Sequence, residues 1–356
     1  MKKLLISLLA FFPLLILLTG VNTAVDPANV LRADRIVSSI IAAFDDGKNA
    51  DGVSDFADRL LMKRYIPTMT AAPDTVVLGS SRGAQIDTAI AGGTLFNSCV
   101  SGATLQDVAA IYQIYHENGL RPKRYILSVD VWFFDKNKTD DRWQLYIAAD
   151  YDAFYREFVD AAYTGDSSMP DTTLRQLISP GYFQESVQAI QNGGYAAARQ
   201  GVVETDSTFT ERGMLRFDGS YVYPKAYAEA DAETVRARVG TAFDSVVGAL
   251  ETSGGMDAER TAVFEALIDA MRADGAEVVL VLSPYHPLMY SNIQASPTAA
   301  ANLEQIVQYL ERYCAQQGIS CIGSYDAHAL GFSEASFMDA LHLNYSYTKK
   351  LLSDYL

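Results

Sequence analysis

The chain has 356 residues, of which 49% are hydrophobic, and its formal net charge is -15. A chain of this length has ample core for one large α/β domain with elaborations, or for two smaller domains. The acidic balance argues against nucleic acid as a partner, because a phosphate backbone is bound by clustered Lys and Arg side chains.

The amino terminus has the pattern of a membrane helix. Lys2 and Lys3 are followed by a stretch without any charge, and its apolar part, residues 4–21, has 18 residues, near the length that spans a bilayer. Asn22-Thr23-Ala24 is a poor cleavage site, because a small residue is preferred where Asn22 stands. We therefore interpret residues 1–25 as an uncleaved transmembrane anchor, with a cleaved secretory signal as the alternative. The two lysines predict a cytoplasmic amino terminus, so either interpretation places the rest of the chain outside the cell membrane.

Residues 26–72 follow as a helical lead-in. Apolar residues recur with helical spacing on both sides of a polar turn at residues 45–49, which predicts two helices. We expect these helices to pack on the next domain, and nothing in them suggests chemistry.

Five apolar runs predict strands at residues 75–78, 94–100, 125–131, 277–282 and 319–322. Helical patterns lie between or after them, at residues 105–118, 258–273, 299–316 and 345–356. Alternation of this kind indicates parallel βαβ units, so we predict an α/β fold with about five parallel strands.

About 145 residues separate the third and fourth strands, although a crossover needs only about a dozen. We predict that residues 136–257 form a large, mainly helical cap, inserted into a domain made of residues 73–135 and 258–356. The insertion follows the carboxyl end of a central strand, so we expect it to cover the functional site at that edge of the sheet. Its aromatics could line an acceptor groove for sugars or a lipid-linked substrate, but most of them are better explained as the core of the cap.

The first predicted strand runs into the turn Gly79-Ser80-Ser81-Arg82-Gly83. A strand that ends in such a turn holds a side chain at the carboxyl edge of an α/β sheet, with backbone N–H groups aimed at whatever that side chain attacks. Ser81 is therefore the candidate nucleophile. The segment at residues 84–91 is expected to open a helix.

A serine nucleophile needs a base, and the chain has only four histidines. His342 follows Asp339 by three residues, a spacing that predicts both on one face of a helical turn, with the carboxylate orienting the imidazole. Asp326-Ala327-His328 is a rival pair, but its one-residue spacing sends the two side chains in different directions. His116 lies late on a predicted helix and is interpreted as a surface residue.

These motifs resemble those of the SGNH (GDSL-like) hydrolases. Gly79-Ser80-Ser81 looks like the first block of that family, usually Gly-Asp-Ser, and Asp339-x-x-His342 looks like the last block. The closer likeness is to the membrane-anchored branch that modifies surface polymers, which includes alginate O-acetyltransferase-like proteins and the teichoic-acid D-alanylation protein. Residues 22–27, Ala57-Asp58-Arg59-Leu60-Leu61 and Asp130-Val131-Trp132 support that placement. The resemblance covers both ends of the chain but not its middle, and it implies a flavodoxin-like, three-layer α/β/α sandwich.

The resemblance also implies an oxyanion hole made by the backbone N–H groups of Ser81 and Gly102. Gly102 falls where the second block of the family supplies such a donor. Without the resemblance, the simpler explanation is a glycine in a strand-to-helix turn.

The third block departs from the family pattern, which has an Asn whose side-chain amide donates to the oxyanion. Here the chain has Asp130, and an ionised carboxylate only accepts hydrogen bonds. Either Asp130 orients another group, such as Arg82, or the hole uses two donors. Arg82 could pair with a carboxylate or phosphate of the substrate, but we favour a structural role in which it holds Asp130 or another nearby carboxylate.

Two further residues are candidates for substrate contact or for support of the site. Trp132 follows Asp130 in the third block, and His286 lies in a loop after the fourth strand, on the same edge of the sheet as Ser81. Prolines on both sides of His286 suggest that it shapes this loop first.

The three cysteines fit no metal spacing, and neither a metal nor a cofactor is predicted. Cys99 is expected as a buried small side chain on the second strand. Cys314 and Cys321 flank a helix-to-strand turn, where they could form a disulfide, but two reduced packing residues are favoured.

The sequence therefore predicts an anchored, extracytoplasmic acyltransferase in which Ser81 attacks an acyl donor, His342 acts as base and then acid, and Asp339 orients His342. By resemblance, the acyl group is acetyl, the acceptor is a cell-surface or secreted polysaccharide, and a membrane-bound O-acyltransferase hands over the acyl group. An anchored carbohydrate esterase with the same triad is one alternative. A non-catalytic scaffold of a polymer-modification complex is the other.

Overall fold

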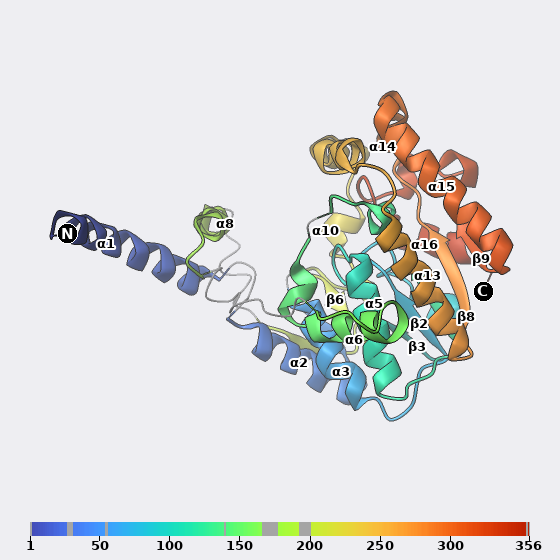
Figure 1. The fold of residues 1–356 in the computed structure, drawn as a ribbon, viewed down its shortest axis with the longest axis horizontal. Coiled ribbons are helices and arrows are strands. Elements are labelled where there is room, and N and C mark those ends of the chain that lie inside the picture. Colours follow the sequence, from blue (N-terminus) through green and yellow to red (C-terminus); the bar gives the residue numbers. More distant parts are fainter. Residues whose placement is uncertain are drawn as a thin grey trace.

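A central β-sheet organises the main body of the molecule, and the N-terminal helix extends away from this body (Figure 1). The structure is a computed structural model, and it describes residues 2–26, 31–53, 56–138, 140–165, 177–191, 201–353 and 355.

The central sheet has five parallel strands in the order β3-β2-β4-β8-β9. The strands are β2 (Thr75–Leu78), β3 (Leu95–Asn97), β4 (Arg124–Ser128), β8 (Glu277–Leu282) and β9 (Ser320–Gly323). Strands β2, β3, β4 and β8 are buried nearly throughout, which explains why they read as continuous apolar runs. The prediction of an α/β fold with five parallel strands is confirmed.

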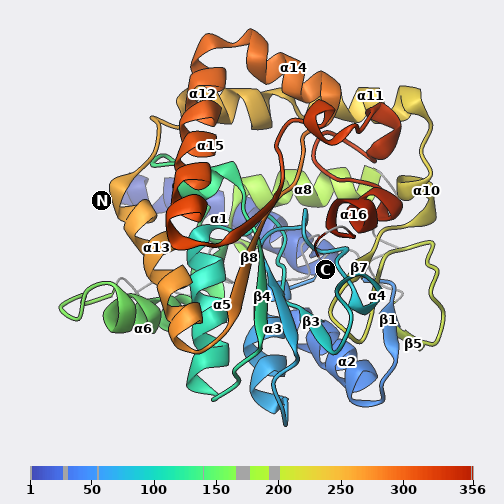
Figure 2. The ribbon, with the colours of Figure 1, turned by 90° about the vertical axis from the view of Figure 1, so that its right-hand side faces the viewer.

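Helices cover both faces of this sheet. Val76 of β2 joins the larger apolar core, whereas its neighbour Val77 joins the smaller core on the opposite face. Figure 2 shows α5, α13 and α15 on one side of the sheet and α4 and α16 on the other. The bounds of these helices are α5 (Leu105–Glu117), α13 (Ala258–Ala273), α15 (Pro297–Gln317), α4 (Thr88–Ala91) and α16 (Tyr345–Leu352).

Several predicted strands and helices were longer than those in the structure. Strand β3 ends at Asn97 rather than at residue 100, and β4 ends at Ser128 rather than at residue 131. Beyond these ends the backbone keeps single hydrogen bonds to a neighbouring strand, such as Ser98 N to Val77 O at 2.8 Å, and then turns away. Helix α4 occupies only the end of the predicted segment 84–91, because it begins after Asp87, whose side chain accepts the hydrogen bond from Ile90 N.

The lead-in has the two predicted helices, α2 (Ala33–Asp45) and α3 (Asp58–Tyr65), followed by the short 3₁₀ turn η1 (Ile66–Thr68). The polar turn between the helices leads into β1 (Asn49–Asp51), a strand that the sequence did not predict. This strand pairs with β5 (Val203–Thr205) and β6 (Met214–Leu215), and β6 pairs with β7 (Tyr221–Val222). The lead-in and the insertion therefore share a small antiparallel sheet, which a local sequence pattern could not indicate.

The insertion contains helices as well as three strands of this second sheet. The turn η2 (Val131–Phe134) precedes the insertion. The helical elements among the described residues of the insertion are η3 (Arg142–Leu145), α6 (Ala148–Phe158), α8 (Pro180–Gln191), α10 (Lys225–Ala228), α11 (Ala232–Thr241), η4 (Asp244–Gly248) and α12 (Ala249–Thr252). Helix α6 packs on α5, and the aromatics around it pack mostly against one another and the core. The aromatics at the start of the insertion are thus mainly core residues, as the sequence favoured. The part of the insertion that reaches the carboxyl edge of the sheet comes later, near β7 and α10.

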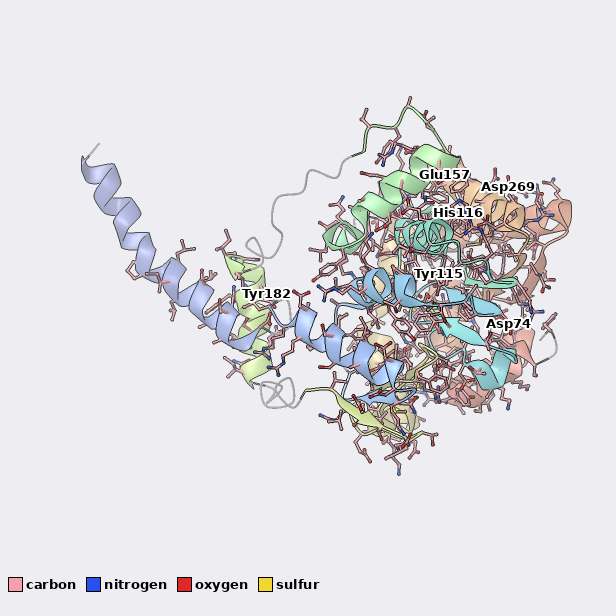
Figure 3. All side chains as sticks on the ribbon, turned by 90° about the horizontal axis from the view of Figure 1, so that it is seen from below. Asp74, Tyr115, His116, Glu157, Tyr182 and Asp269 are labelled. Carbon is pink, nitrogen blue, oxygen red and sulfur yellow. The ribbon has the colours of Figure 1, made fainter. Side chains whose placement is uncertain are left out.

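The N-terminal segment forms α1 (Lys2–Val25), and its end packs against α8. Figure 3 shows Tyr182 on α8, next to the end of α1. Tyr182 donates a hydrogen bond to Asp26 at 2.8 Å, and Asn22 donates to the carbonyl oxygens of Leu177 and Ser179. Among the described residues, no helix combines the length and the apolar character needed to cross a membrane.

After the insertion, the remaining elements are α14 (Pro287–Ala295) and two 3₁₀ turns, η5 (His328–Leu330) and η6 (Glu334–Ser336). The thiols of Cys99, Cys314 and Cys321 are free. Cys99 lies just past the end of β3 and is only half-buried, in contrast to its predicted place on a buried strand.

Candidate active site

Ser81 stands in a tight turn directly after β2. Gly79 has φ +137, and a Cβ atom at this position would lie only 2.7 Å from the Ser128 carbonyl oxygen of β4. Only a glycine allows the turn to pass so close to the neighbouring strand. The turn is closed by hydrogen bonds from Gly83 N to Ser80 O at 3.0 Å and from Ala84 N to Ser81 O at 3.2 Å. These contacts hold the Ser81 side chain at the carboxyl edge of the sheet.

His342 and Asp339 meet Ser81 from the loop between η6 and α16. Ser81 Oγ lies 2.8 Å from His342 Nε2, and His342 Nδ1 lies 2.7 Å from Asp339 Oδ2. The sequence-predicted nucleophile, base and orienting carboxylate are therefore within hydrogen-bond distance of one another. This is the geometry in which a histidine can take the proton of a serine hydroxyl while a carboxylate fixes its tautomer.

The loop that carries this pair is not the helical turn that the spacing suggested. Residues 337–344 form bends, closed by a bridge between Phe337 and Leu343. Asp339 Oδ1 accepts hydrogen bonds from the backbone N–H groups of Leu341 and His342, at 2.7 and 2.8 Å. An Asp side chain that bonds the backbone two residues ahead stabilises a turn in place of a helix. The three-residue spacing thus brings the pair together through an Asp-stabilised turn.

Tyr227 of α10 adds a contact that the sequence did not reveal. Its hydroxyl donates a hydrogen bond to Asp339 Oδ2, the oxygen that also faces His342. Burial alone would raise the pKa of Asp339, but hydrogen bonding and charge from His342, together with the bond from Tyr227, hold that pKa well below its usual value. Asp339 is therefore ionised at neutral pH. Arg238 supports Tyr227, because its guanidinium lies 4.0 Å from the centroid of the Tyr227 ring.

Tyr223 closes the same side of the site. Its ring centroid lies 5.6 Å from that of His342, and its hydroxyl lies 3.5 Å from the Ser81 carbonyl oxygen. Burial, followed by the charge of Asp339, raises the pKa of Tyr223 well above its usual value, so this phenol stays neutral. Both tyrosines belong to the run Tyr221-Val222-Tyr223-Pro224-Lys225-Ala226-Tyr227, whose three tyrosines were the signal available in the sequence.

Two backbone N–H groups are available for an oxyanion. Among the described residues, neither Ser81 N nor Gly102 N donates a hydrogen bond within the chain. Gly102 has φ +56, and a Cβ atom there would collide with the Arg142 guanidinium. The positive φ favours glycine at this position, and a larger residue would also have to displace the partly exposed Arg142 side chain.

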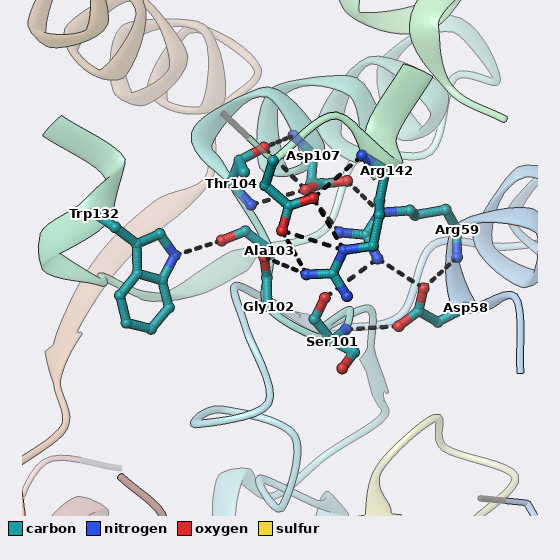
Figure 4. A network of polar contacts seen from close by, with 10 residues as sticks. Asp58, Arg59, Ser101, Gly102, Ala103, Thr104, Asp107, Trp132 and Arg142 are labelled. Atoms are coloured by element: carbon teal, nitrogen blue, oxygen red, sulfur yellow. Dashed lines mark hydrogen bonds and ion pairs between the residues drawn. The ribbon is translucent and has the colours of Figure 1, made fainter. Parts of the chain in front are cut away.

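A buried ion-pair network holds the loop that carries Gly102 (Figure 4). Arg59, only 4% exposed, pairs with Asp107 through Nε at 2.7 Å and with Asp58 through Nη1 at 3.0 Å. It also donates to the Ser101 carbonyl oxygen at 3.2 Å, while Ser101 N donates to Asp58 at 2.6 Å. Asp107 in turn caps α5 by accepting from Thr104 N at 2.7 Å. The lead-in helix α3 thus positions the candidate oxyanion loop, although the sequence suggested no chemical role for the lead-in.

Arg82 points into the protein, where it is buried. Its Nη1 lies 3.1 Å from Asp130 Oδ1, and its Nη2 donates to the carbonyl oxygens of Ser283 and Pro284. The guanidinium carbon lies 4.7 Å from the centroid of the Tyr285 ring. Burial raises the pKa of Asp130, and Arg82 opposes that shift. The favoured prediction that Arg82 holds Asp130 is confirmed, and this pair ties the nucleophile turn to the ends of β4 and β8.

Neither His286 nor His328 forms a hydrogen bond with Ser81 in the described structure, as a general base would. His286 is fully buried, its Nδ1 accepts the hydrogen bond from Leu288 N at 3.1 Å, and its ring packs on Phe337. Burial lowers the pKa of His286, so it caps α14 as a neutral ring and shapes the loop. His328 is exposed, and only its backbone bonds to Asp326, at 2.8 Å. The rival pair is therefore not assembled.

His116 is not the plain surface residue that was predicted. It is half-buried, with Nδ1 2.9 Å from Asp274 and Nε2 3.2 Å from Glu157 (Figure 3). This contact joins α5 to neighbouring elements, away from the triad.

Within the described parts of the chain, one cavity is lined by Ser81, and another lies beside the triad, with Gly102 and Leu341 in its wall. The Ser81 cavity, of about 180 Å³, is lined by Ser81, Cys99, Ser101, Leu215 and Tyr223, among others. The Trp132 cavity, of about 210 Å³, starts at Gly102 and Leu341 and runs between Trp132 and the helices η4, α12 and α15. The indole N–H of Trp132 donates to the Ala103 carbonyl oxygen at 2.8 Å, which fixes the ring beside the oxyanion loop.

Within the described parts of the chain, no cluster of three or more His, Cys, Asp or Glu side chains could hold a metal ion. No protein-family model matches the chain, and no curated protein sequence matches it.

Proposed function

We propose that the chain is an extracytoplasmic serine acyltransferase of SGNH type, which transfers an acyl group, acetyl by resemblance, onto a cell-surface or secreted polysaccharide. The observation that carries this proposal is the continuous contact from Ser81 through His342 to Asp339, with distances of 2.8 and 2.7 Å. The arrangement of helices on both faces of a parallel sheet supports the proposal of an SGNH-type sandwich.

In the proposed first step, His342 Nε2 takes the proton of Ser81, and Ser81 Oγ forms a bond to the acyl carbon of the donor. The negative charge that develops on the carbonyl oxygen faces the N–H groups of Ser81 and Gly102, each worth roughly 3 kcal/mol of the barrier. His342 then gives its proton to the leaving group, and an acyl-serine remains.

In the second step, a hydroxyl group of the acceptor gives its proton to His342 and attacks the acyl-serine. The new ester forms, the bond to Ser81 Oγ breaks, and His342 returns the proton to Ser81. Asp339 keeps Nδ1 of His342 protonated throughout, so that Nε2 is always the nitrogen that exchanges a proton with substrate.

Membrane attachment belongs to the same proposal and rests on the sequence. Lys2 and Lys3 before an uncharged stretch support a cytoplasmic amino terminus and an extracytoplasmic domain. A membrane-bound O-acyltransferase is the proposed source of the acyl group.

The scaffold alternative would be favoured by a His342 remote from Ser81, and their 2.8 Å contact instead supports an enzyme. A carbohydrate esterase would use the same residues with water as the acceptor, so a separate measurement has to distinguish it.

The test is intact-mass spectrometry of the full-length chain after incubation with an activated acetyl ester. We expect an acetyl adduct on the wild-type chain, none on Ser81→Ala or His342→Ala, and an unchanged adduct on His328→Ala, which removes an exposed histidine. Oligosaccharide acceptors then distinguish transfer from hydrolysis, because only a transferase yields acetylated sugar. A wild-type chain that neither gains the adduct nor consumes the ester would contradict the proposed enzyme and favour the scaffold.

A further inference from the structure

The Trp132 cavity has walls that suit an apolar ligand. Its aliphatic side chains come from η2, η4, α12, α15 and the loop of the catalytic histidine, and they are Val131, Val246, Leu250, Ile306 and Leu341. The rings of Trp132 and Tyr285 add to this lining, and Asp135, Lys138, Ser245 and Ser253 form its smaller polar part. Burying apolar surface of a ligand against the aliphatic and aromatic walls is favourable.

The cavity lies beside the site of the proposed chemistry, although Ser81, His342 and Asp339 do not line it. Gly102, one of the two candidate oxyanion donors, forms part of its wall, and Leu341 immediately precedes His342. The Trp132 cavity is therefore within reach of a substrate group that extends past Gly102 or Leu341. The Ser81 cavity shares no lining residue with it and has Ser101, rather than Gly102, in its wall.

A change of helix type shapes the far wall. Residues Asp244–Gly248 form the π-helical turn η4, and Ser245 and Val246 of this turn line the cavity. A π-helical turn is wider than an α-helical one and is often found at functional sites. The insertion thus departs from regular helix at the place where it faces this space.

We propose that the Trp132 cavity binds an aliphatic chain of the substrate. This inference rests on the proposed acyl-transfer function. The aliphatic group could come from either side of the ester bond: from the acyl group itself, or from the alkyl part of the alcohol. The cavity extends the reaction beyond acetyl esters of small alcohols to substrates with an aliphatic tail.

Binding can be measured without catalysis, because the chain has only two tryptophans. In the Ser81→Ala, Trp143→Phe double variant of the full-length chain, Trp132 is the single fluorescent reporter. Terminally brominated octanoate is added to this protein, held in an amphipathic polymer because the tail of an alkyl detergent would compete for the cavity. We expect saturable quenching of Trp132 that unlabelled octanoate reverses, and that Ala249→Phe, a change at the exposed mouth of the cavity, weakens. Linear quenching without saturation would overturn the proposal.

Steady-state kinetics with two series of esters identify which part of the substrate carries the aliphatic group. One ester series varies the acyl group from acetyl to octanoyl with a fixed alcohol, and the other varies the alcohol from methyl to octyl with a fixed acetyl group. In Ala249→Phe, the ratio of kcat/KM for long over short chains should fall by about tenfold in one of the series. The control is Ala301→Phe, the same substitution at an exposed position of α15 that does not line the cavity.

The two proposals fail in distinguishable ways. If neither ratio changes in Ala249→Phe, the cavity does not take the substrate chain and the further inference is wrong, although the esterase or transferase activity stands. If no ester is consumed but the fluorescence of Trp132 is quenched saturably, the cavity binds the aliphatic group and the proposed catalysis is wrong.

Discussion

Tyr227 donates a hydrogen bond to the same carboxylate oxygen of Asp339 that contacts His342 Nδ1. Tyr227 lies in the insertion, whereas the triad lies at the carboxyl edge of the main sheet. The insertion therefore positions the carboxylate that contacts the proposed catalytic base, and does not only cover the site.

Tyr227→Phe should lower kcat by about tenfold with little change in KM, because it removes one hydrogen bond to a charged group that is worth about 1.5 kcal/mol or more. The pKa of Asp339 should rise as well, because one donor is lost, so any loss of kcat that comes from protonation of Asp339 should begin at a higher pH than in the wild-type chain. Steady-state kinetics across pH measure both effects. Tyr345→Phe is the matched control, because Tyr345 donates to Asp87 at 2.8 Å away from the triad. A profile identical to that of Tyr345→Phe would mean that Tyr227 has no positioning role.

The depressed pKa of Asp339 also predicts how stability depends on pH. Ionised Asp339 favours the folded state, so its contribution is complete above the ordinary aspartate pKa of about 4 and is lost as the pH falls below that value. Urea unfolding between neutral pH and pH of about 3 should therefore show a smaller acid-induced loss of unfolding free energy in Asp339→Asn than in the wild-type chain. If the free energy of unfolding fell with pH by the same amount in both proteins, the lowered pKa of Asp339 would be contradicted.

Arg59→Ala should destabilise the fold and slow the chemistry together. It leaves Asp58 and Asp107 buried without their partner, which typically costs about 3–5 kcal/mol, and it frees the loop that presents Gly102. Arg124→Ala is the control: Arg124 pairs with Glu277 at 2.7 Å on the surface, and its loss should cost less than about 1 kcal/mol. Chemical denaturation and kcat/KM measure the two effects. If Arg59→Ala were no worse than Arg124→Ala, the network would have no role in holding the loop.

Gly102→Ala should reduce kcat/KM by more than about tenfold, because it disturbs a candidate oxyanion donor through its positive φ and through contact with Arg142. Gly119→Ala is the matched control: Gly119 also has a positive φ, +68, but a Cβ atom there meets nothing within 4 Å. Equal activity losses in Gly102→Ala and Gly119→Ala would argue against Gly102 as a donor.

Much of the central sheet could be predicted from sequence. Strands β2 and β8 and helix α13 begin and end at the predicted residues, because their buried apolar runs and polar boundaries are encoded locally. The ends of β3 and β4 were overestimated, since the apolar residues that follow them are buried in irregular backbone. Asp339 and His342 were also recognisable as a pair, but the type of turn that joins them was not.

Other features depended on contacts between distant parts of the chain. Strand β1 is three residues long and exists because β5 and β6 pair with it from the insertion. Tyr227 reaches Asp339 across 112 positions of sequence, and Arg59 reaches Asp107 across 48. No local pattern records such pairings, since propensity and periodicity describe neighbours along the chain.

The sequence by itself determined the α/β class, the place of Ser81 after a buried strand, and the choice of His342 over His328 as the base. These follow from residue types at short spacing, which limit how the backbone can run and where a side chain can point. Only the tertiary structure decided that the lead-in holds the Gly102 loop, that the insertion supplies Tyr223 and Tyr227, and that a second cavity opens beside Trp132. Those results required the packing of segments far apart in sequence, because burial and hydrogen bonding between them form only when the whole chain is folded.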